Sequence, residues 1–163
     1  MITWLASYPK SGNTWLRSLL ATYFYSTDGI FNFNLLKFID QYPSVAYFKK
    51  YEDSFSSPES TAKYWLDEQD KINKDKKLRF FKTHNAMCRI NKFRFTDASK
   101  TLGAIYIVRD PRNIISSMCN HYAIDLDKAY TKMTDANSSL SFKLANEDYS
   151  NFTFLGKWSN HYW

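Results

Sequence analysis

Short apolar runs alternate along the chain with segments whose apolar residues recur at helical spacing. The apolar runs predict three strands, over residues 2–7, 78–83 and 102–108. The helical spacing predicts helices over residues 12–26, 60–73, 111–122 and 125–136, with weaker helical patterns over 138–146 and from Asn151 onward. Strands that alternate with helices indicate an α/β fold in which a parallel sheet is flanked by helices in three layers.

The first predicted strand passes into its helix through a tight turn, YPKSGNTW, over residues 8–15. A strand that turns directly into a helix directs several backbone N–H groups outward from the first helical turn, with the positive end of the helix dipole behind them. Gly12 allows close approach of a ligand, Ser11 and Thr14 add hydroxyl donors, and Lys10 adds a positive charge. The segment therefore predicts a P-loop-like cradle for phosphate or sulfate, although an ordinary connection with an incidental lysine is the alternative.

A second strand–turn–helix connection follows residues 102–108, an almost continuous apolar run that we expect to be buried on both faces of the sheet. Asp110 suits the N-cap of the next helix and Pro111 its first position. Arg109 and Arg112 flank this helix start, and arginine side chains match the geometry of phosphate oxygens. A surface ion pair between an arginine and Asp110 is the alternative.

Lys82 and His84 end the remaining predicted strand. Ligands of open α/β sheets bind beyond the carboxyl ends of the strands, so we expect Lys10, Lys82, His84 and Arg109 at one edge of one sheet. A lone histidine is more often structural than catalytic, but its place two residues after a lysine at a strand end makes His84 a candidate general base.

Four motifs together resemble the sulfotransferases that use 3'-phosphoadenosine 5'-phosphosulfate (PAPS). Residues 8–15 resemble the 5'-phosphosulfate loop YPKSGTTW of that family. Arg109 to Asn113, with Ser117 eight residues after Arg109, resembles the 3'-phosphate motif. Lys82-Thr83-His84 resembles the segment of the catalytic histidine, and residues 156–163 are similar to the family's G-x-W-x-x-H-x-x-x-W stretch, with the last tryptophan one place early.

The resemblance implies which residues bind the donor nucleotide. Lys10 would contact the bridging oxygen and the sulfonate, and the 5'-phosphate would be held by Ser11, Gly12, Asn13 and Thr14. Trp15 would stack on the adenine, unless it is a core residue of the first helix. Arg109 and Ser117 would bind the 3'-phosphate.

The resemblance also implies the reaction, which is transfer of sulfonate from PAPS to a hydroxyl or amine of a small acceptor molecule. His84 would take the proton from the acceptor, Lys10 would stabilise the leaving phosphate, and Lys82 would help with charge near the sulfonate. No metal is expected, because the transferred group carries little charge. A non-catalytic nucleotide-binding chain is the alternative. A P-loop nucleotide kinase is a weaker one, because the lysine does not follow the glycine and no magnesium-binding acidic motif stands out.

Two departures from the family pattern are visible in the sequence. Asn85-Ala86 follows His84 where family members that act on phenols and steroids have Leu-Pro. The Gly-rich basic segment that closes the family domain does not occur, so we expect residues 1–163 to be a single sulfotransferase-like domain that is incomplete at its C-terminus.

Composition narrows the class of partner less than the motifs do. The net charge of +6 favours a polyanionic ligand but would suit nucleic acid as well, and only the motifs favour a small molecule over nucleic acid. Cys88 and Cys119 are too few for a disulfide framework and have no metal-site spacing. No apolar run reaches about 20 residues, so neither a membrane span nor a signal peptide is indicated and a cytoplasmic location is expected. The aromatic-rich residues 31–51 could pack on the sheet or line an acceptor pocket.

Overall fold

The computed structural model describes residues 1–140 and 148–161 and confirms the α/β class. Its central element is a parallel sheet in the order β2-β1-β5, formed by Arg79–Thr83 (β2), Ile2–Ser7 (β1) and Thr101–Ile107 (β5). β1 is aligned with β2 from Ile2↔Arg79 to Ala6↔Thr83. Its alignment with β5, on the other side, ends at Ser7↔Ile107. All three strands therefore end at the same edge of the sheet.

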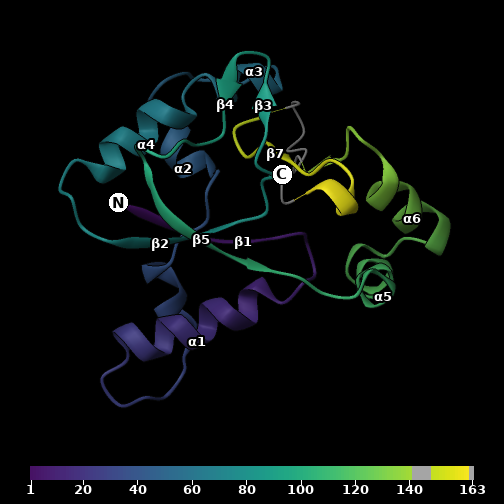
Figure 1. Ribbon diagram of the computed structural model, residues 1–163, viewed down its shortest axis with the longest axis horizontal. Helices are drawn as coiled ribbons and strands as arrows, with labels where there is room; N and C mark the ends of the chain where they lie inside the picture. The colour runs from purple at the N-terminus through teal and green to yellow at the C-terminus, as the bar shows by residue number, and fades with distance from the viewer. Residues whose placement is uncertain (141–147, 162–163) are drawn as a thin grey trace.

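Helices cover both faces of this sheet (Figure 1). One face carries Asn13–Tyr25 (α1) and the 3-10 helix Phe33–Phe38 (η1). The other face carries Val45–Phe48 (α2), Pro58–Ala62 (α3) and Trp65–Asn73 (α4). Pro111–Tyr122 (α5) and Leu126–Thr134 (α6) pack together beyond the carboxyl end of β5.

Alternate side chains of β1 build two separate cores, as the two-residue period of a strand requires. Trp4 points to the α4 side, where it packs in a cluster with Trp65 and Phe81. Leu5 points to the opposite side and packs with Ala21 of α1 and Ile39. Burial on both faces of β1 places the loop that follows it on a rigid support.

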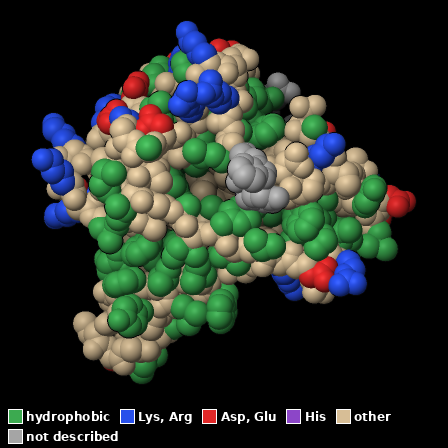
Figure 2. Space-filling view, in the orientation of Figure 1, with side chains coloured by type: hydrophobic (Ala, Val, Ile, Leu, Met, Phe, Trp, Pro, Cys, Tyr) green, Lys and Arg blue, Asp and Glu red, His purple; other side chains and the backbone are tan. Residues whose placement is uncertain are grey.

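The apolar residues of α1 do not all face the sheet. Leu16 and Leu20 pack against the Leu5 cluster, whereas Tyr23 is 81% exposed and Leu19 is 48% exposed. Figure 2 shows hydrophobic side chains on the surface over α1 and the segment after it. The apolar positions of α1 therefore extend around more of the helix than the sheet covers.

The predicted helix over 60–73 is two helices, α3 and α4, with a break at Lys63 and Tyr64. The first begins earlier than expected because Ser57 is its N-cap: Ser57 and Ser60 form a reciprocal capping box, and Pro58 occupies the first helical position. The helix therefore begins before residue 60, where the sequence predicted its start.

The segments predicted least clearly contain short antiparallel strands. Arg89–Ile90 (β3) pairs with Phe93–Arg94 (β4) in the connection between β2 and β5. Ser139–Leu140 (β6) pairs with Thr153–Phe154 (β7), and a 3-10 helix, Trp158–Asn160 (η2), follows. The helices expected over 138–146 and from Asn151 are wrong for the described residues, because long-range pairing between β6 and β7 determines their conformation; residues 141–147 lie outside the described part.

Strand β5 is less buried than its apolar sequence predicts. Leu102 is 63% exposed, Ile105 is 43% exposed, and Val108, just after the strand, is 70% exposed. Among the described residues β5 pairs only with β1, so burial on both faces was the wrong expectation for this strand. No helix within residues 1–140 and 148–161 is long and apolar enough to span a membrane.

Candidate functional site

A cavity of about 480 Å³ lies at the edge where the parallel strands end. Its walls come from the loop after β1, the end of β2, Arg109 just before α5 and the later turns of α5. The predicted site residues that line it are Lys10, Gly12, Asn13, Thr14, Trp15, Lys82, His84, Arg109 and Ser117. Ser11 alone among the predicted set does not line it and is buried in the loop. The structure therefore brings together residues that are up to 107 positions apart, from Lys10 to Ser117.

The loop after β1 has two residues in the left-handed region, Lys10 at φ 68° and Gly12 at φ 103°. A lysine rarely adopts this conformation, which costs about 1–2 kcal/mol for a residue with a Cβ atom. Arg109 Nη1 donates to Lys10 O at 2.9 Å, and Ser11 N donates to Tyr8 O at 3.3 Å, so the strained turn is held from both sides. Such strain is concentrated at functional sites.

The N-terminus of α1 is open, unlike those of α5 and α6. Gly12 is the N-cap residue of α1, no side chain caps the helix, and its first turn holds no acidic residue. By contrast, Asp110 caps α5 by accepting from Arg112 N, and Asp125 caps α6 by accepting from Lys128 N. The amides of α1 and its dipole are therefore available to an anion in the cavity.

Two buried polar atoms beside this helix start have no hydrogen-bond partner within the described part of the protein. They are Ser11 Oγ and Asn13 Oδ1, in residues that are 6% and 3% exposed. Leaving a buried polar atom unpaired costs about 1–3 kcal/mol. The Ser11 hydroxyl can donate a hydrogen bond to a phosphate oxygen, whereas Asn13 Oδ1 can only accept and needs a donor such as an ordered water.

The Asn13 side chain also holds the strand ends together. Its Nδ2 donates to Leu5 O at 2.8 Å and Ser7 Oγ at 3.1 Å, and lies 3.4 Å from Thr83 O. These partners belong to the ends of β1 and β2. Asn13 therefore fixes the spacing of the two strands that carry Lys10 and His84.

His84 is held in one tautomer by the backbone of β1. Its Nδ1 lies 2.8 Å from Ser7 O and 3.3 Å from Ser7 Oγ. A carbonyl oxygen can only accept, so Nδ1 carries the hydrogen and Nε2 keeps its lone pair. Burial, and then the charge of Lys82, lower the pKa of His84 to about 3. The ring is therefore neutral at pH 7, with the lone pair of Nε2 unprotonated.

Lys82 is partly removed from water and has no carboxylate partner among residues 1–140 and 148–161. Its Nζ donates to Gln41 Oε1 at 3.1 Å. Burial first, and then the charges of Arg17 and Lys10, lower the pKa of Lys82 to about 8. An anion in the cavity would reverse this effect by stabilising the charged form.

The two arginines at the start of α5 have different roles. Arg112 forms a salt bridge with Asp110, at 2.6 Å from Nη2 to Oδ2, and this pair lowers the pKa of Asp110 to about 2. Arg109 has no carboxylate partner among the described residues and faces the cavity. The alternative of a surface ion pair is thus correct for Arg112 and wrong for Arg109.

Trp15 is 71% exposed and lines the cavity, so the alternative that it is a core residue is wrong. Of the aromatic residues between 31 and 51, Tyr42 and Phe48 are fully buried in the core, whereas Phe31, Phe33 and Phe38 are exposed; only Gln41 from this region reaches the cavity.

Sequence reasoning missed several lining residues: Pro9, Gln41, His121, Tyr122, Leu140 and Thr153. His121 follows Ser117 by one helical turn, so the period of α5 could have placed both on one face. Gln41 gave no such signal. It reaches the cavity because Tyr42 N donates to Lys82 O and Lys82 N donates to Asp40 O, a long-range pairing that spacing along the chain does not reveal.

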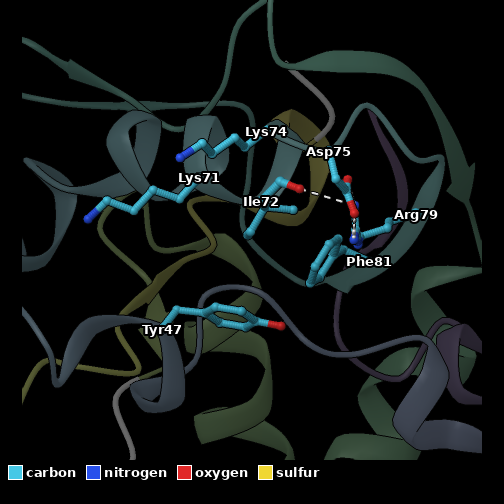
Figure 3. Close-up of a pocket in the computed structure, with 7 residues that line it drawn as sticks. All are labelled: Tyr47, Lys71, Ile72, Lys74, Asp75, Arg79 and Phe81. Carbon is cyan, nitrogen blue, oxygen red and sulfur yellow. Dashed lines mark hydrogen bonds and ion pairs between the residues drawn. The ribbon is translucent and has the colours of Figure 1, made fainter.

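A second basic cavity, of about 540 Å³, lies where β2 begins (Figure 3). Arg79 donates two hydrogen bonds of 2.6 Å to the carboxylate of Asp75 and a third, of 3.1 Å, to Ile72 O. Tyr47, on its wall, donates to Asp40 Oδ2 at 2.7 Å. The guanidinium charge in this cavity is already neutralised.

The residues of the first cavity suit an anion and a proton transfer. Lys10, Lys82 and Arg109 supply positive charge, the start of α1 supplies free amides, and no carboxylate lines the cavity in the described part of the chain. Residues 1–140 and 148–161 hold no cluster of three metal-binding side chains. A comparison with curated proteins gives no match. The model of the sulfotransferase domain family matches residues 2–162, and the chain therefore belongs to this family of transferases.

Proposed function

We propose that the cavity binds PAPS and transfers its sulfonate to a hydroxyl or amine of a small acceptor molecule. The observation that carries this proposal is that Lys10, Lys82 and Arg109, which have no carboxylate partner in the described part of the chain, line one cavity with the neutral imidazole of His84. The family match supports sulfonate transfer in general. The donor and the roles of individual residues are our inference.

The 5'-phosphosulfate end of the donor would lie against the start of α1. The backbone amides of residues 11–14 and the hydroxyls of Ser11 and Thr14 would bind it. The unpartnered buried Ser11 Oγ supports this because a hydroxyl can donate to a phosphate oxygen, while the Asn13 side chain would hold the loop in place through its bonds to Leu5 O and Ser7 Oγ. Lys10 would stabilise the negative charge that builds on the bridging oxygen, as preorganised charges do in transfer reactions generally.

The 3'-phosphate would lie between Arg109 and Ser117, with Trp15 available to stack on the adenine. Arg109 supports this role because its charge is unpaired and its position is fixed by the bond to Lys10 O. Ser117 and Arg109 line the same cavity from α5 and from the turn before it.

His84 would accept the proton of the attacking hydroxyl or amine at Nε2, while its Nδ1–H stays bonded to Ser7 O. Its low pKa in the ligand-free site would be raised by the donor, because the donor's negative charge offsets those of Lys82 and Lys10. The pKa of Lys82, which burial lowers to about 8 in the ligand-free site, would be raised by the same negative charge.

We further propose that residues 1–163 act as one sulfotransferase-like domain in the cytoplasm. A nucleotide kinase is less well supported, because no carboxylate of the described residues lines the cavity to hold magnesium. A non-catalytic nucleotide-binding role is the alternative that the experiment must separate.

The test incubates the chain with PAPS and a panel of phenols, aliphatic alcohols and primary amines, and measures sulfonated product and 3'-phosphoadenosine 5'-phosphate (PAP) by mass spectrometry. We expect PAP and product in equal amounts with at least one acceptor class. PAP binding without product for every acceptor would favour the non-catalytic role, and phosphoryl transfer from ATP with magnesium would favour a kinase.

A further inference from the structure

The backbone of His84 is held by a second histidine from the far end of the described chain. His161 is 1% exposed, its Nε2 lies 2.8 Å from His84 O, and its Nδ1 lies 2.7 Å from the hydroxyl of Tyr106. The carbonyl oxygen can only accept, so Nε2 carries the hydrogen. Burial lowers the pKa of His161, and in the neutral ring Nδ1 must then accept from Tyr106. The hydrogen bonds run in one direction, from Tyr106 through His161 to His84.

These hydrogen bonds join the two outer strands of the sheet across β1. Tyr106 belongs to β5, and His84 follows β2 directly. Ala6 of β1 is aligned with Tyr106 on one side and with Thr83 on the other. The small side chain of Ala6 lies in the same hollow as the rings of Tyr106 and His161. Tyr8 packs edge-on against His161, with ring centroids 5.2 Å apart.

The residues after His84 are fixed by the same C-terminal segment. Asn85 Oδ1 accepts from Phe154 N at 2.8 Å, and Ala86 N donates to Phe154 O at 2.8 Å. The imidazole of His84 is thus oriented by Ser7 on one side, while its peptide unit is oriented by His161 on the other. A rotation of that peptide would move Nε2 relative to the cavity.

We propose that His161 and Tyr106 are positioning residues that hold His84 with its Nε2 directed into the cavity. This inference rests on the proposed function, in which His84 is the general base. Positioning matters in such reactions because a displacement of about 1 Å can lower the rate about 100-fold. A purely structural role would instead lower stability and leave the orientation and tautomer of His84 unchanged in the folded protein.

Tyr106→Phe is the most specific test because it removes one hydroxyl and keeps the ring. Tyr42→Phe is the control: the Tyr42 hydroxyl is buried and donates to a carbonyl oxygen, that of Trp65 at 2.8 Å, and in the described part of the chain it bonds neither to His84 nor to His161. We expect Tyr106→Phe to lower kcat about 10- to 100-fold with PAP affinity nearly unchanged. Tyr42→Phe should leave kcat unchanged in the folded protein. Equal effects of the two variants on kcat would overturn the proposal.

A second pair of variants addresses His161 itself. The amide of glutamine can donate to His84 O and accept from Tyr106, so His161→Gln should recover most of the kcat that His161→Ala loses. If His161→Ala does not fold, Tyr106→Phe and His161→Gln still provide the test. No recovery by glutamine, together with normal kcat in Tyr106→Phe, would contradict a positioning role.

A readout that needs no turnover separates this proposal from the proposed function. The ¹⁵N shifts of the His84 imidazole in the ligand-free chain report its tautomer, which should be the Nδ1–H form in the unmutated protein and in Tyr42→Phe. Tyr106→Phe should shift both nitrogens toward the average of the two tautomers. An unchanged His84 spectrum in Tyr106→Phe overturns the positioning role even if the chain transfers no sulfonate. A changed spectrum in a chain that transfers no sulfonate supports the positioning role and contradicts only the proposed function.

Discussion

Arg79 and Arg109 line two basic cavities at opposite ends of the same sheet, but only Arg79 is neutralised. Arg79 starts β2 and forms a two-bond pair with Asp75, so that the pKa of Asp75 lies well below its usual range (Figure 3). Arg109 follows β5 and binds a backbone carbonyl instead of a carboxylate. The fold thus satisfies the arginine in one cavity and leaves the cations of the other to an outside partner.

The cavity that Arg109 lines also has features that lower the free energy of unfolding. Lys10 has a left-handed backbone, two buried polar atoms lack partners, and burial with like charges lowers the pKa of Lys82 to about 8. Costs of this kind persist where a ligand compensates for them. The comparison indicates that the cavity at the carboxyl ends of the strands is the one built for an anion.

The largest expected effect comes from replacing His84, the proposed base in the cavity that Arg109 lines. His84→Asn keeps an N–H group for Ser7 O but has no group at the position of Nε2. We expect kcat for sulfonate transfer to fall about 10²- to 10⁴-fold, the usual range for positioned proton transfer. PAP affinity, measured by calorimetry, should change little because His84 is neutral. A folded variant with normal kcat would remove His84 from the mechanism.

A smaller expected effect concerns the pH dependence of PAP affinity. It distinguishes the two cavities because a lysine lines each of them. Lys82 binds an anion in its charged form, so PAP affinity should be constant below its pKa of about 8 and fall above it. The fall should be up to about tenfold per pH unit, since binding must then take up a proton. Lys82→Met should remove this dependence, whereas Lys74→Met, in the other cavity, should leave it intact. A dependence that survives in Lys82→Met would assign the titration to another group.

The two strand–turn–helix connections were predictable because their determinants are local. The apolar runs of β1 and β5, the glycine at the start of α1, and Asp110 with Pro111 at the start of α5 are neighbours in sequence. The parallel order of the strands then brings Lys10, Lys82, His84 and Arg109 to one edge. The main part of the cavity therefore follows from the sequence and the resemblance.

The remaining features depend on contacts between distant residues. The pairing of β6 with β7 overrides the helical pattern near Asn151, and Gln41 reaches Lys82 only through the pairing of its segment with β2. The contact from His161 to His84 O joins residues 77 positions apart. The motif residue His161 could be singled out from the sequence, but its partners could not.

The most direct test of the central claim is a titration that compares the two arginines with two nucleotides. PAP and AMP differ by the 3'-phosphate, and Arg109→Gln and Arg79→Gln are the same change in the two cavities. We expect Arg109→Gln to weaken PAP binding by about tenfold or more, as expected for the loss of a charge-assisted contact of about 1.5–3 kcal/mol. The same variant should affect AMP little, and Arg79→Gln should affect neither nucleotide. Equal weakening of PAP and AMP by Arg109→Gln, or a loss of PAP binding in Arg79→Gln as large as that in Arg109→Gln, would contradict the account.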